Sequence, residues 1–136
     1  MTREKMREIV MQLIFQAEAQ KDMEDGSAYA YIQEKIKGNA NKEYAKKLYV
    51  CWREHISEID SVLDEASNKW RVGRMPRIDL AVLRVAATEI LYMDETPDAV
   101  AVNEAVELAK RFGTEGSAKF INGLLGKVIK NKNADE

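Results

Sequence analysis

A helical spacing of apolar side chains recurs along almost the whole chain, and this feature constrains the fold more than any other. Between residues 6 and 17 the apolar positions follow the i, i+3, i+4, i+7 spacing of one helix face. Similar stripes occur at 29–36, 45–66, 78–93, 102–109 and 120–129. The 136 residues include only seven Gly and two Pro, which disfavours a turn-rich β architecture. We therefore predict an all-α fold of six to seven helices, with one long helix running from Asn41 to Ala66.

The periodicity fails between Trp70 and Pro76. Proline disfavours the helical conformation of the residue before it, so Met75 is expected to be extended. We interpret this segment as a joint between two small packed helical bundles within a single domain of residues 1–136. The predicted boundaries are about 1–68 for the N-terminal subdomain and about 77–131 for the C-terminal subdomain.

Several classes of protein are disfavoured by what the sequence lacks. No apolar run approaches the ~20 residues that span a bilayer, and the first ten residues hold no signal-peptide core, so we expect a cytoplasmic protein. His55 and Cys51 are the single histidine and cysteine, too few for a four-ligand zinc site. The sequence contains no Gly-rich phosphate-binding motif and no nucleophile placed beside a base. We therefore predict that the chain is not an enzyme and binds no metal or cofactor.

The net charge of −2 hides a segregation of charged residues along the chain. Four bases and no acid lie between Lys69 and Arg77, and four more bases without an acid lie between Lys119 and Lys132. Three further bases lie at positions 3, 5 and 7. Such blocks are often solvated helix faces, but they can also give a locally positive surface that attracts phosphates. The sequence is therefore compatible with nucleic-acid binding despite its acidic average.

Three ordered motifs in the second half of the chain resemble the NusB family of transcription antitermination factors. They are AVLRVA at 81–86 followed by EIL at 89–91, VNEAVELAK at 102–110 followed by FG at 112–113, and KFINGLL at 119–125. The first helix, with Arg7-Glu8 and Gln12, is similar to the N-terminal helix of that family. The resemblance covers almost the whole chain and is closest between Asp79 and Leu125.

The resemblance implies an all-helical protein of two small bundles that pairs with the ribosomal small-subunit protein NusE. It also implies that the pair binds boxA, a short single-stranded RNA element of ribosomal RNA leaders, and helps the transcription elongation complex read through terminators. The family's RNA contacts lie on the basic N-terminal helix and around the FG and KFxNG motifs. Carried over to this chain, the predicted RNA-binding residues are Arg3, Lys5, Arg7, Lys110, Phe112, Lys119, Phe120 and Asn122.

The chemistry of these residues suits single-stranded RNA, which offers phosphates and unstacked bases. Lys and Arg side chains bind phosphates, a Phe ring stacks on a nucleobase, and an Asn amide forms hydrogen bonds with a nucleobase edge. Structural alternatives exist for several of them: core packing for Phe120, a helix-packing contact for Asn122-Gly123, and a solvated surface for Lys110. The predicted RNA surface also requires the N-terminal bases to converge in space with the patch of Lys119, Phe120 and Asn122.

A second surface is predicted for the protein partner. Asp79 resembles a family position near the NusE surface, and we group it with Arg77 and Trp70 as partner-binding residues. The alternative for Asp79 is a favourable interaction with the dipole at the start of its helix. Arg84 and Glu89 interrupt an otherwise apolar helix, so both are expected to form ion pairs if they are buried.

Two other functions stay open at this point. One is a helical protein-interaction module, or a homodimer, that binds RNA weakly. The other is the NusB-like domain of a truncated RNA methyltransferase, because some enzymes of that kind carry such a domain ahead of the catalytic one. No cofactor-binding βαβ unit follows the helices before Glu136, which favours a stand-alone factor.

Overall fold

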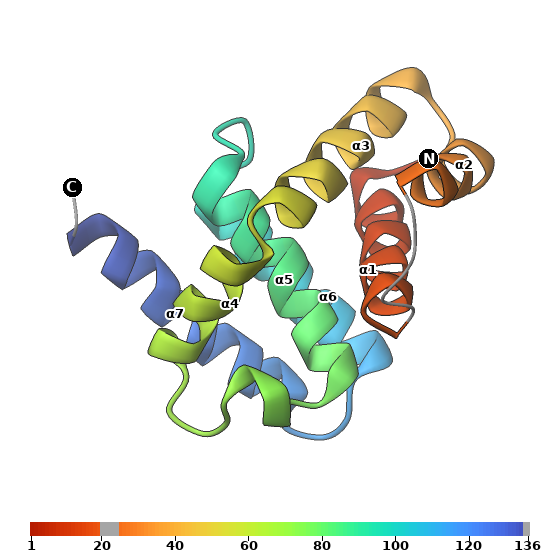
Figure 1. The fold of residues 1–136 in the computed structure, drawn as a ribbon. Helices are drawn as coiled ribbons and strands as arrows, with labels where there is room; N and C mark the ends of the chain where they lie inside the picture. Colours follow the sequence, from red (N-terminus) through yellow and green to blue (C-terminus); the bar gives the residue numbers. More distant parts are fainter. Residues whose placement is uncertain (20–24, 135–136) are drawn as a thin grey trace.

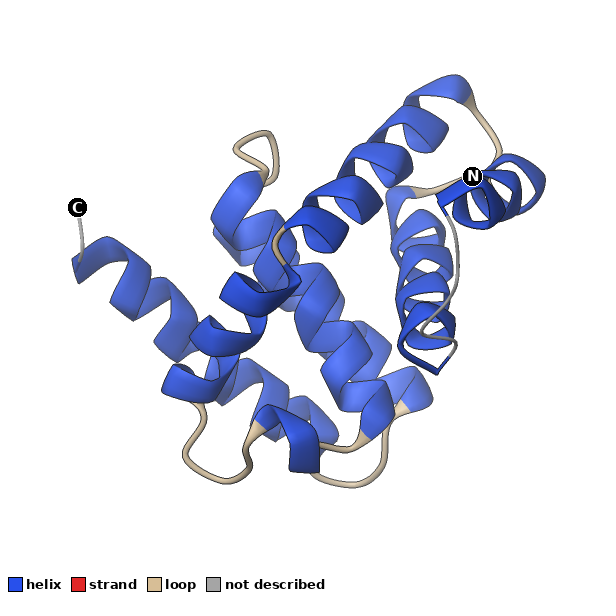
Figure 2. Cartoon of the chain, in the orientation of Figure 1, coloured by secondary structure: helices blue, strands red, loops and turns tan. Residues whose placement is uncertain are grey.

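The computed structural model describes residues 1–19 and 25–134, and in these ranges all regular elements are helices, with no strand (Figures 1 and 2). The all-α prediction is confirmed. None of the described helices is long and apolar enough to cross a membrane. The elements are α1 (Arg3–Ala19), α2 (Asp25–Lys35), α3 (Asn39–Glu54), α4 (Ile56–Ala66), the 3₁₀ helix η1 (Val72–Arg74), α5 (Arg77–Tyr92), α6 (Asp98–Phe112) and α7 (Ser117–Ala134).

The prediction of one long helix over 41–66 is wrong, because α3 and α4 occupy this stretch and meet at His55. The φ and ψ angles of His55 are −128° and 26°, outside the helical range, and its Nδ1 lies 2.8 Å from the carbonyl oxygen of Cys51. Trp52 and Ile59 are buried on either side of the break, so the apolar stripe continues across it. Neither Gly nor Pro marks this position, which is why periodicity alone did not reveal the break.

Helix α5 is the centre of the fold and packs against α1, α3, α4, α6 and α7. Figure 1 shows α1 on one side of α5, and α4 with α7 on the other. Every residue from Asp79 to Ile90 is buried, as expected for a helix surrounded by others. Because α5 contacts helices from both predicted subdomains, the boundaries at about 1–68 and 77–131 stay a prediction.

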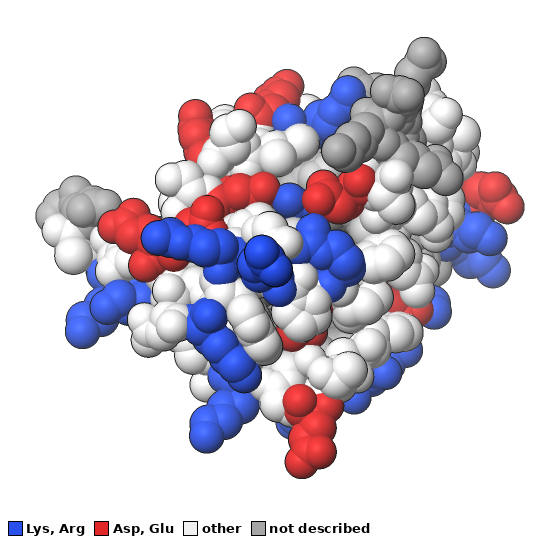
Figure 3. Space-filling view, turned by 60° about the horizontal axis from the view of Figure 1, so that its bottom comes forward, with Lys and Arg blue, Asp and Glu red and all other residues white. Residues whose placement is uncertain are grey.

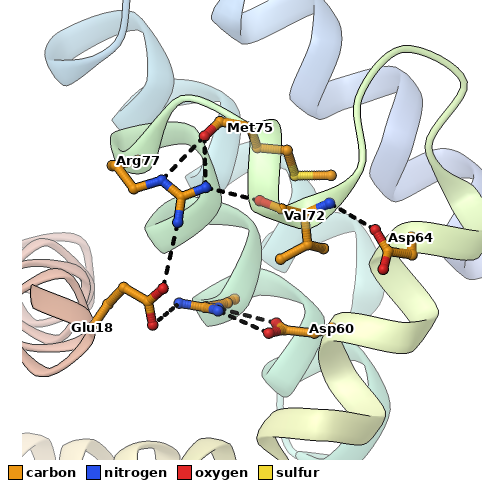
Figure 4. A network of polar contacts seen from close by, with 7 residues as sticks. Glu18, Asp60, Asp64, Val72, Met75 and Arg77 are labelled. Carbon is orange, nitrogen blue, oxygen red and sulfur yellow. Dashed lines mark hydrogen bonds and ion pairs between the residues drawn. The ribbon is translucent and has the colours of Figure 1, made fainter. Parts of the chain in front are cut away.

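Two charged side chains in the middle of α5 are buried, and both form ion pairs, as predicted. The Arg84 guanidinium donates to both carboxylate oxygens of Asp60 in α4, at 3.1 and 2.8 Å, and its Nη1 lies 3.1 Å from Oε2 of Glu18 in α1 (Figure 4). Glu89 pairs with Arg7 of α1. Removing one partner of a buried pair leaves the other charge uncompensated, so these pairs fasten the neighbouring helices to α5.

The joint between α4 and α5 is ordered by side-chain hydrogen bonds to its backbone. Asp64 accepts a hydrogen bond of 2.7 Å from the Val72 N–H. Arg77 donates to the carbonyl oxygens of Val72 and Met75, at 2.8 and 2.9 Å (Figure 4). Met75 has φ −67° and ψ 145°, the extended conformation expected before Pro76. These hydrogen bonds give the joint a defined path, and it runs along the lower edge of the molecule in Figure 1.

Candidate nucleic-acid interface

Arg7, which was expected to contact RNA, lies inside the protein. It is 5% exposed, and its guanidinium donates to the Glu89 carboxylate of α5 at 2.9–3.1 Å. Tyr44 of α3 donates its hydroxyl to the same carboxylate at 2.6 Å and also bonds to Thr96. Burial lowers the pKa of Arg7, but the contacts with Glu89 outweigh this effect and raise the pKa. A buried carboxylate needs a counter-charge, and Arg7 supplies it to Glu89. Together with Tyr44, this ion pair joins α1 to α3 and α5.

The other two N-terminal bases lie on the surface. The Arg3 guanidinium lies 4.3 Å from the ring centre of Tyr44, a cation–π contact that fixes its direction. The Nζ of Lys5 lies 2.6 Å from Oε2 of Glu8. Glu8 is only 4% exposed, and its Oε1 lies 2.6 Å from Nη2 of Arg111 in α6. Burial raises the pKa of Glu8, but the two bases outweigh this effect and hold the pKa below its ordinary value.

The C-terminal end of α6 carries two exposed bases beside an aromatic ring. Lys110 lies 3.4 Å from Glu107. The Arg111 guanidinium lies 4.8 Å from the centre of the half-buried Phe112 ring. Arg111 was not predicted from the sequence, although its position between two predicted RNA-binding residues was the available signal. We name the group formed by Arg3, Lys5, Lys110, Arg111 and Phe112 the α1–α6 surface.

The KFxNG motif lies in the first turns of α7. Its Phe120 is half-buried, and the ring packs edge-on against Trp70 with ring centres 5.0 Å apart. Lys119 and Asn122 are exposed. A Cβ atom added at Gly123 would meet nothing within 4 Å, so close helix packing does not explain this glycine. We name the group of Trp70, Lys119, Phe120 and Asn122 the α7 patch.

The turn between α6 and α7 sets the position of the α7 patch. A Cβ atom on Gly113 would approach Oγ of Ser117 to 2.6 Å and the carbonyl oxygen of Ala109 to 2.7 Å, so this position requires glycine. The Ser117 hydroxyl accepts a hydrogen bond of 3.0 Å from the Thr114 N–H and donates one of 2.8 Å to Oδ1 of Asp79. The FG motif therefore makes a tight turn that anchors the start of α7 at the start of α5.

Apart from the buried Arg7, the predicted RNA-binding residues thus form two groups. Within residues 1–19 and 25–134, no ion pair or ring contact joins the α1–α6 surface to the α7 patch. The turn over 113–116 connects them, since it runs from the last residue of α6 to the first of α7. Figure 3 brings forward the face that carries the joint, and Lys and Arg side chains gather across it.

The three predicted partner-binding residues lie in different environments. Asp79 is 3% exposed and receives the Ser117 hydrogen bond, so its carboxylate faces the interior. Burial raises the pKa of Asp79, and the hydrogen bond from Ser117 opposes this shift. Trp70 is half-buried in its contact with α7. Arg77 is exposed, with its Nη1 3.4 Å from Glu18.

A small pocket of about 200 Å³ lies beside Arg77, between α1 and α5. Phe15 lines it and is 37% exposed, so part of its ring is open to a partner at the pocket. Phe15 was not predicted as a site residue. The available signal was its position off the apolar stripe of the first helix, because an aromatic residue on the outer face has no core to fill.

Among the described residues, no group of three or more His, Cys, Asp or Glu side chains is placed to hold a metal ion. The His55 ring stacks on Tyr92 with ring centres 4.1 Å apart. Cys51 is half-buried, and burial raises the pKa of its thiol, which disfavours the nucleophilic thiolate. The chemistry that the two surface groups offer is therefore ion pairing, ring stacking and amide hydrogen bonding.

Comparison with known proteins places these features in a family. The NusB family model matches residues 4–130. The transcription antitermination protein NusB of Finegoldia magna is 37% identical over 132 residues, which cover 97% of this chain and 96% of that protein. The solved structure of T. maritima NusB matches with a TM-score of 0.85 and 31% identity, over 100% of this chain and 99% of its own. A structure of antitermination factors NusB and NusE in complex with dsRNA matches with a TM-score of 0.84 and 25% identity, over 95% of this chain and 96% of the matched chain.

Proposed function

The chain belongs to the NusB family, and from this premise we propose that it is a transcription antitermination factor that binds single-stranded boxA-type RNA of ribosomal RNA leaders together with ribosomal protein NusE. The name of its relatives and the similar structure that contains NusB, NusE and RNA support this proposal. The proposed activity is binding, without catalysis. It is exerted in the cytoplasm, on the transcription elongation complex.

The observation that carries the proposal is the α1–α6 surface. There the buried Glu8 holds Lys5 and Arg111 side by side, although they come from helices far apart in the sequence. Exposed Lys and Arg side chains at fixed positions bind successive phosphates, and the neighbouring Phe112 ring offers a face on which a nucleobase can stack. Arg3 adds a cation whose direction is already fixed. A single-stranded RNA that crosses the start of α1 and the end of α6 meets these groups in turn.

We assign nucleobase contacts to the α7 patch. The exposed Asn122 amide can both donate and accept hydrogen bonds, and Phe120 presents a partly open ring. Lys110 and Lys119 are exposed on either side of the connecting turn and suit the phosphates between the two groups. Arg7 contributes by position, because its pair with Glu89 fixes α1 on α5.

For NusE we propose the pocket beside Arg77. An exposed aromatic ring next to an exposed guanidinium is the composition typical of residues that dominate protein interfaces, and Phe15 and Arg77 provide it here. Asp79 and Trp70 do not line this pocket: Asp79 receives the Ser117 hydrogen bond at the start of α7, and Trp70 packs on Phe120.

The test is a titration of labelled boxA-type RNA with the protein, alone and with NusE, at several salt concentrations. We expect NusE to raise the affinity and salt to lower it. The Arg3→Gln variant should reduce the salt slope by about 0.7, the value for one phosphate contact on a single strand. Lys37→Gln removes an exposed lysine between α2 and α3 and is the matched control. A wild-type protein that does not bind the RNA, or an unchanged slope in Arg3→Gln, would contradict the proposal.

A further inference from the structure

A groove runs along α7 on the side that faces the end of α4 and the joint. Its volume is about 590 Å³, within the range of pockets that hold a ligand. Phe120 lines its near end, and the α7 residues that line the remainder follow at helical spacing as far as Lys130. The groove therefore begins at the α7 patch and continues about three turns further along the helix.

Four lysines and no carboxylate line this groove. They are Lys69, Lys119, Lys127 and Lys130. In the described part of the chain none of the four forms an ion pair, whereas Lys132, also in α7, lies 3.2 Å from Asp98. Cations gathered without counter-charges create a positive potential in a concave surface, and such a potential attracts a polyanion.

Two glycines form the floor of the groove, and packing does not account for them. A Cβ atom added at Gly123 or Gly126 would meet nothing within 4 Å. Both lie inside α7, where glycine is among the least favourable residues. Gly113 differs from them, because a Cβ atom there would collide with Ser117. Gly123 and Gly126 leave the helix backbone bare along the groove, so a ligand can approach it closely.

The wall of the groove nearest the α7 patch is aromatic. Phe120 packs edge-on against Trp70, and the Nζ of Lys69 lies 4.2 Å from the centre of the Trp70 ring. A lysine held beside a ring at the mouth of a lysine-lined groove is the combination used to bind single-stranded nucleic acid, in which bases stack and the backbone follows the cations.

We propose that RNA continues past Phe120 into this groove, with its phosphates on the four lysines and its backbone against Gly123 and Gly126. This inference rests on the proposed function and deepens it, because it gives the path of the nucleotides that flank the recognised element. The occupant is RNA rather than an acidic protein segment, because the groove is continuous with the nucleobase contacts assigned to the α7 patch.

The test compares two RNAs by fluorescence anisotropy: the boxA-type element alone, and the same element extended by six uridines at either end. One phosphate contact is worth about fivefold in affinity at 0.1 M salt. We expect the wild type to bind one of the extended RNAs more tightly than the short RNA. The Lys127→Gln/Lys130→Gln variant should lose about 25-fold in affinity for the extended RNA, and its salt slope should fall by about 1.4. Its affinity for the short RNA should not change.

The Gly123→Ala/Gly126→Ala variant separates binding from stability. Alanine favours the helix, so the Tm should rise by about 3 °C for each substitution. The added methyl groups occupy the groove floor, so the gain from RNA extension should shrink. If the two glycines had only a structural role, the variant would not combine a higher Tm with weaker binding of the extended RNA and unchanged binding of the short RNA. The Lys37→Gln variant is again the control.

Each outcome decides between the two proposals. If the wild type binds neither RNA, the proposed function fails, and the groove inference fails with it. If it binds the short RNA but gains nothing from either extension, only the groove inference is overturned. The same holds if the lysine variant keeps the gain, a result that also fits a groove reserved for an acidic protein segment.

Discussion

The start of α1 and the groove along α7 are both rich in Lys and Arg, yet these side chains differ in burial and in ion pairing. In α1, Arg7 is buried against Glu89, Lys5 is held by Glu8, and Arg3 lies over the Tyr44 ring. In the groove, the four lysines make no ion pair within residues 1–19 and 25–134. One such block can therefore include a cross-link of the fold, as Arg7 does in α1, while another consists of lysines that all stay available to a ligand.

The cause of the difference is what each helix packs against. Helix α1 lies against α5, which carries a buried carboxylate, and that carboxylate draws a base into the interior. The groove side of α7 leaves a space towards the end of α4 and the joint, and Gly123 and Gly126 provide no side chains to fill it. Burial, more than the number of Lys and Arg residues, decides which of these side chains remain available to RNA.

The largest expected effect on stability comes from breaking the buried ion pair between Arg7 and Glu89. Arg7→Ala leaves Glu89 buried without its cation, so the free energy of unfolding should fall by about 3–5 kcal/mol. Urea denaturation followed by circular dichroism measures this change. The double variant Arg7→Met/Glu89→Leu removes both charges and should recover most of the stability. A loss below about 1 kcal/mol in Arg7→Ala would mean that Arg7 is not a cross-link.

A smaller effect is expected from the hydroxyl that completes the same network. Tyr44→Phe keeps the ring under Arg3 and removes the hydrogen bonds to Glu89 and Thr96, so stability should fall by about 1–2 kcal/mol. Burial, followed by the bond to Glu89, raises the pKa of Tyr44 to about 12. The neutral phenol is therefore favoured in the folded state, and its stabilisation is present below pH 10 and lost as the pH rises towards 12.

The pH dependence gives this variant its own control. Between pH 10 and 12 the wild type should lose stability more steeply than Tyr44→Phe, because the variant has no phenol to ionise at this position. Tyr92, whose pKa is also raised to about 12, is present in both proteins and contributes equally to both curves. Parallel curves would show that Tyr44 ionises equally easily in the folded and unfolded chains.

The smallest expected effect on stability comes from replacing the unpaired lysines of the groove. Lys127→Gln/Lys130→Gln removes no ion pair, so the free energy of unfolding should change by less than about 0.5 kcal/mol. Thermal and urea unfolding of the variant beside the wild type measure it. A loss above about 1 kcal/mol would show that these lysines stabilise the fold, and the contrast with α1 would disappear.

Helical periodicity and the interruption of an apolar stripe were sufficient to predict the all-α fold and the pairing of Arg84 and Glu89. The identity of the partners was not predictable, since Arg7 lies 82 positions from Glu89 and the contact depends on how α1 crosses α5. The same limit applies to Glu8, whose burial follows from the approach of α6. Periodicity shows which face of a helix is buried, but not which charged neighbour another helix brings to it.

The same distinction between local signals and long-range contacts applies to the site residues. The FG and KFxNG motifs indicated the turn and the α7 patch, because they are local in sequence. Two explanations for Gly123 stood until the space around its missing side chain was known. The break at His55 had no local signal of any kind, since histidine is compatible with a helix interior.

Because Glu89 takes its counter-ion from the seventh residue, the first two turns of α1 are a component of the core. Proteolytic clipping after this residue would strand the Glu89 carboxylate in the interior and would weaken the attachment of α1 to α5. The clipped product would have a larger unfolded population, which favours its degradation in a cell. Loss of Arg7 would therefore lower the amount of folded protein, whereas loss of Arg3 or Lys5 alone would weaken RNA binding.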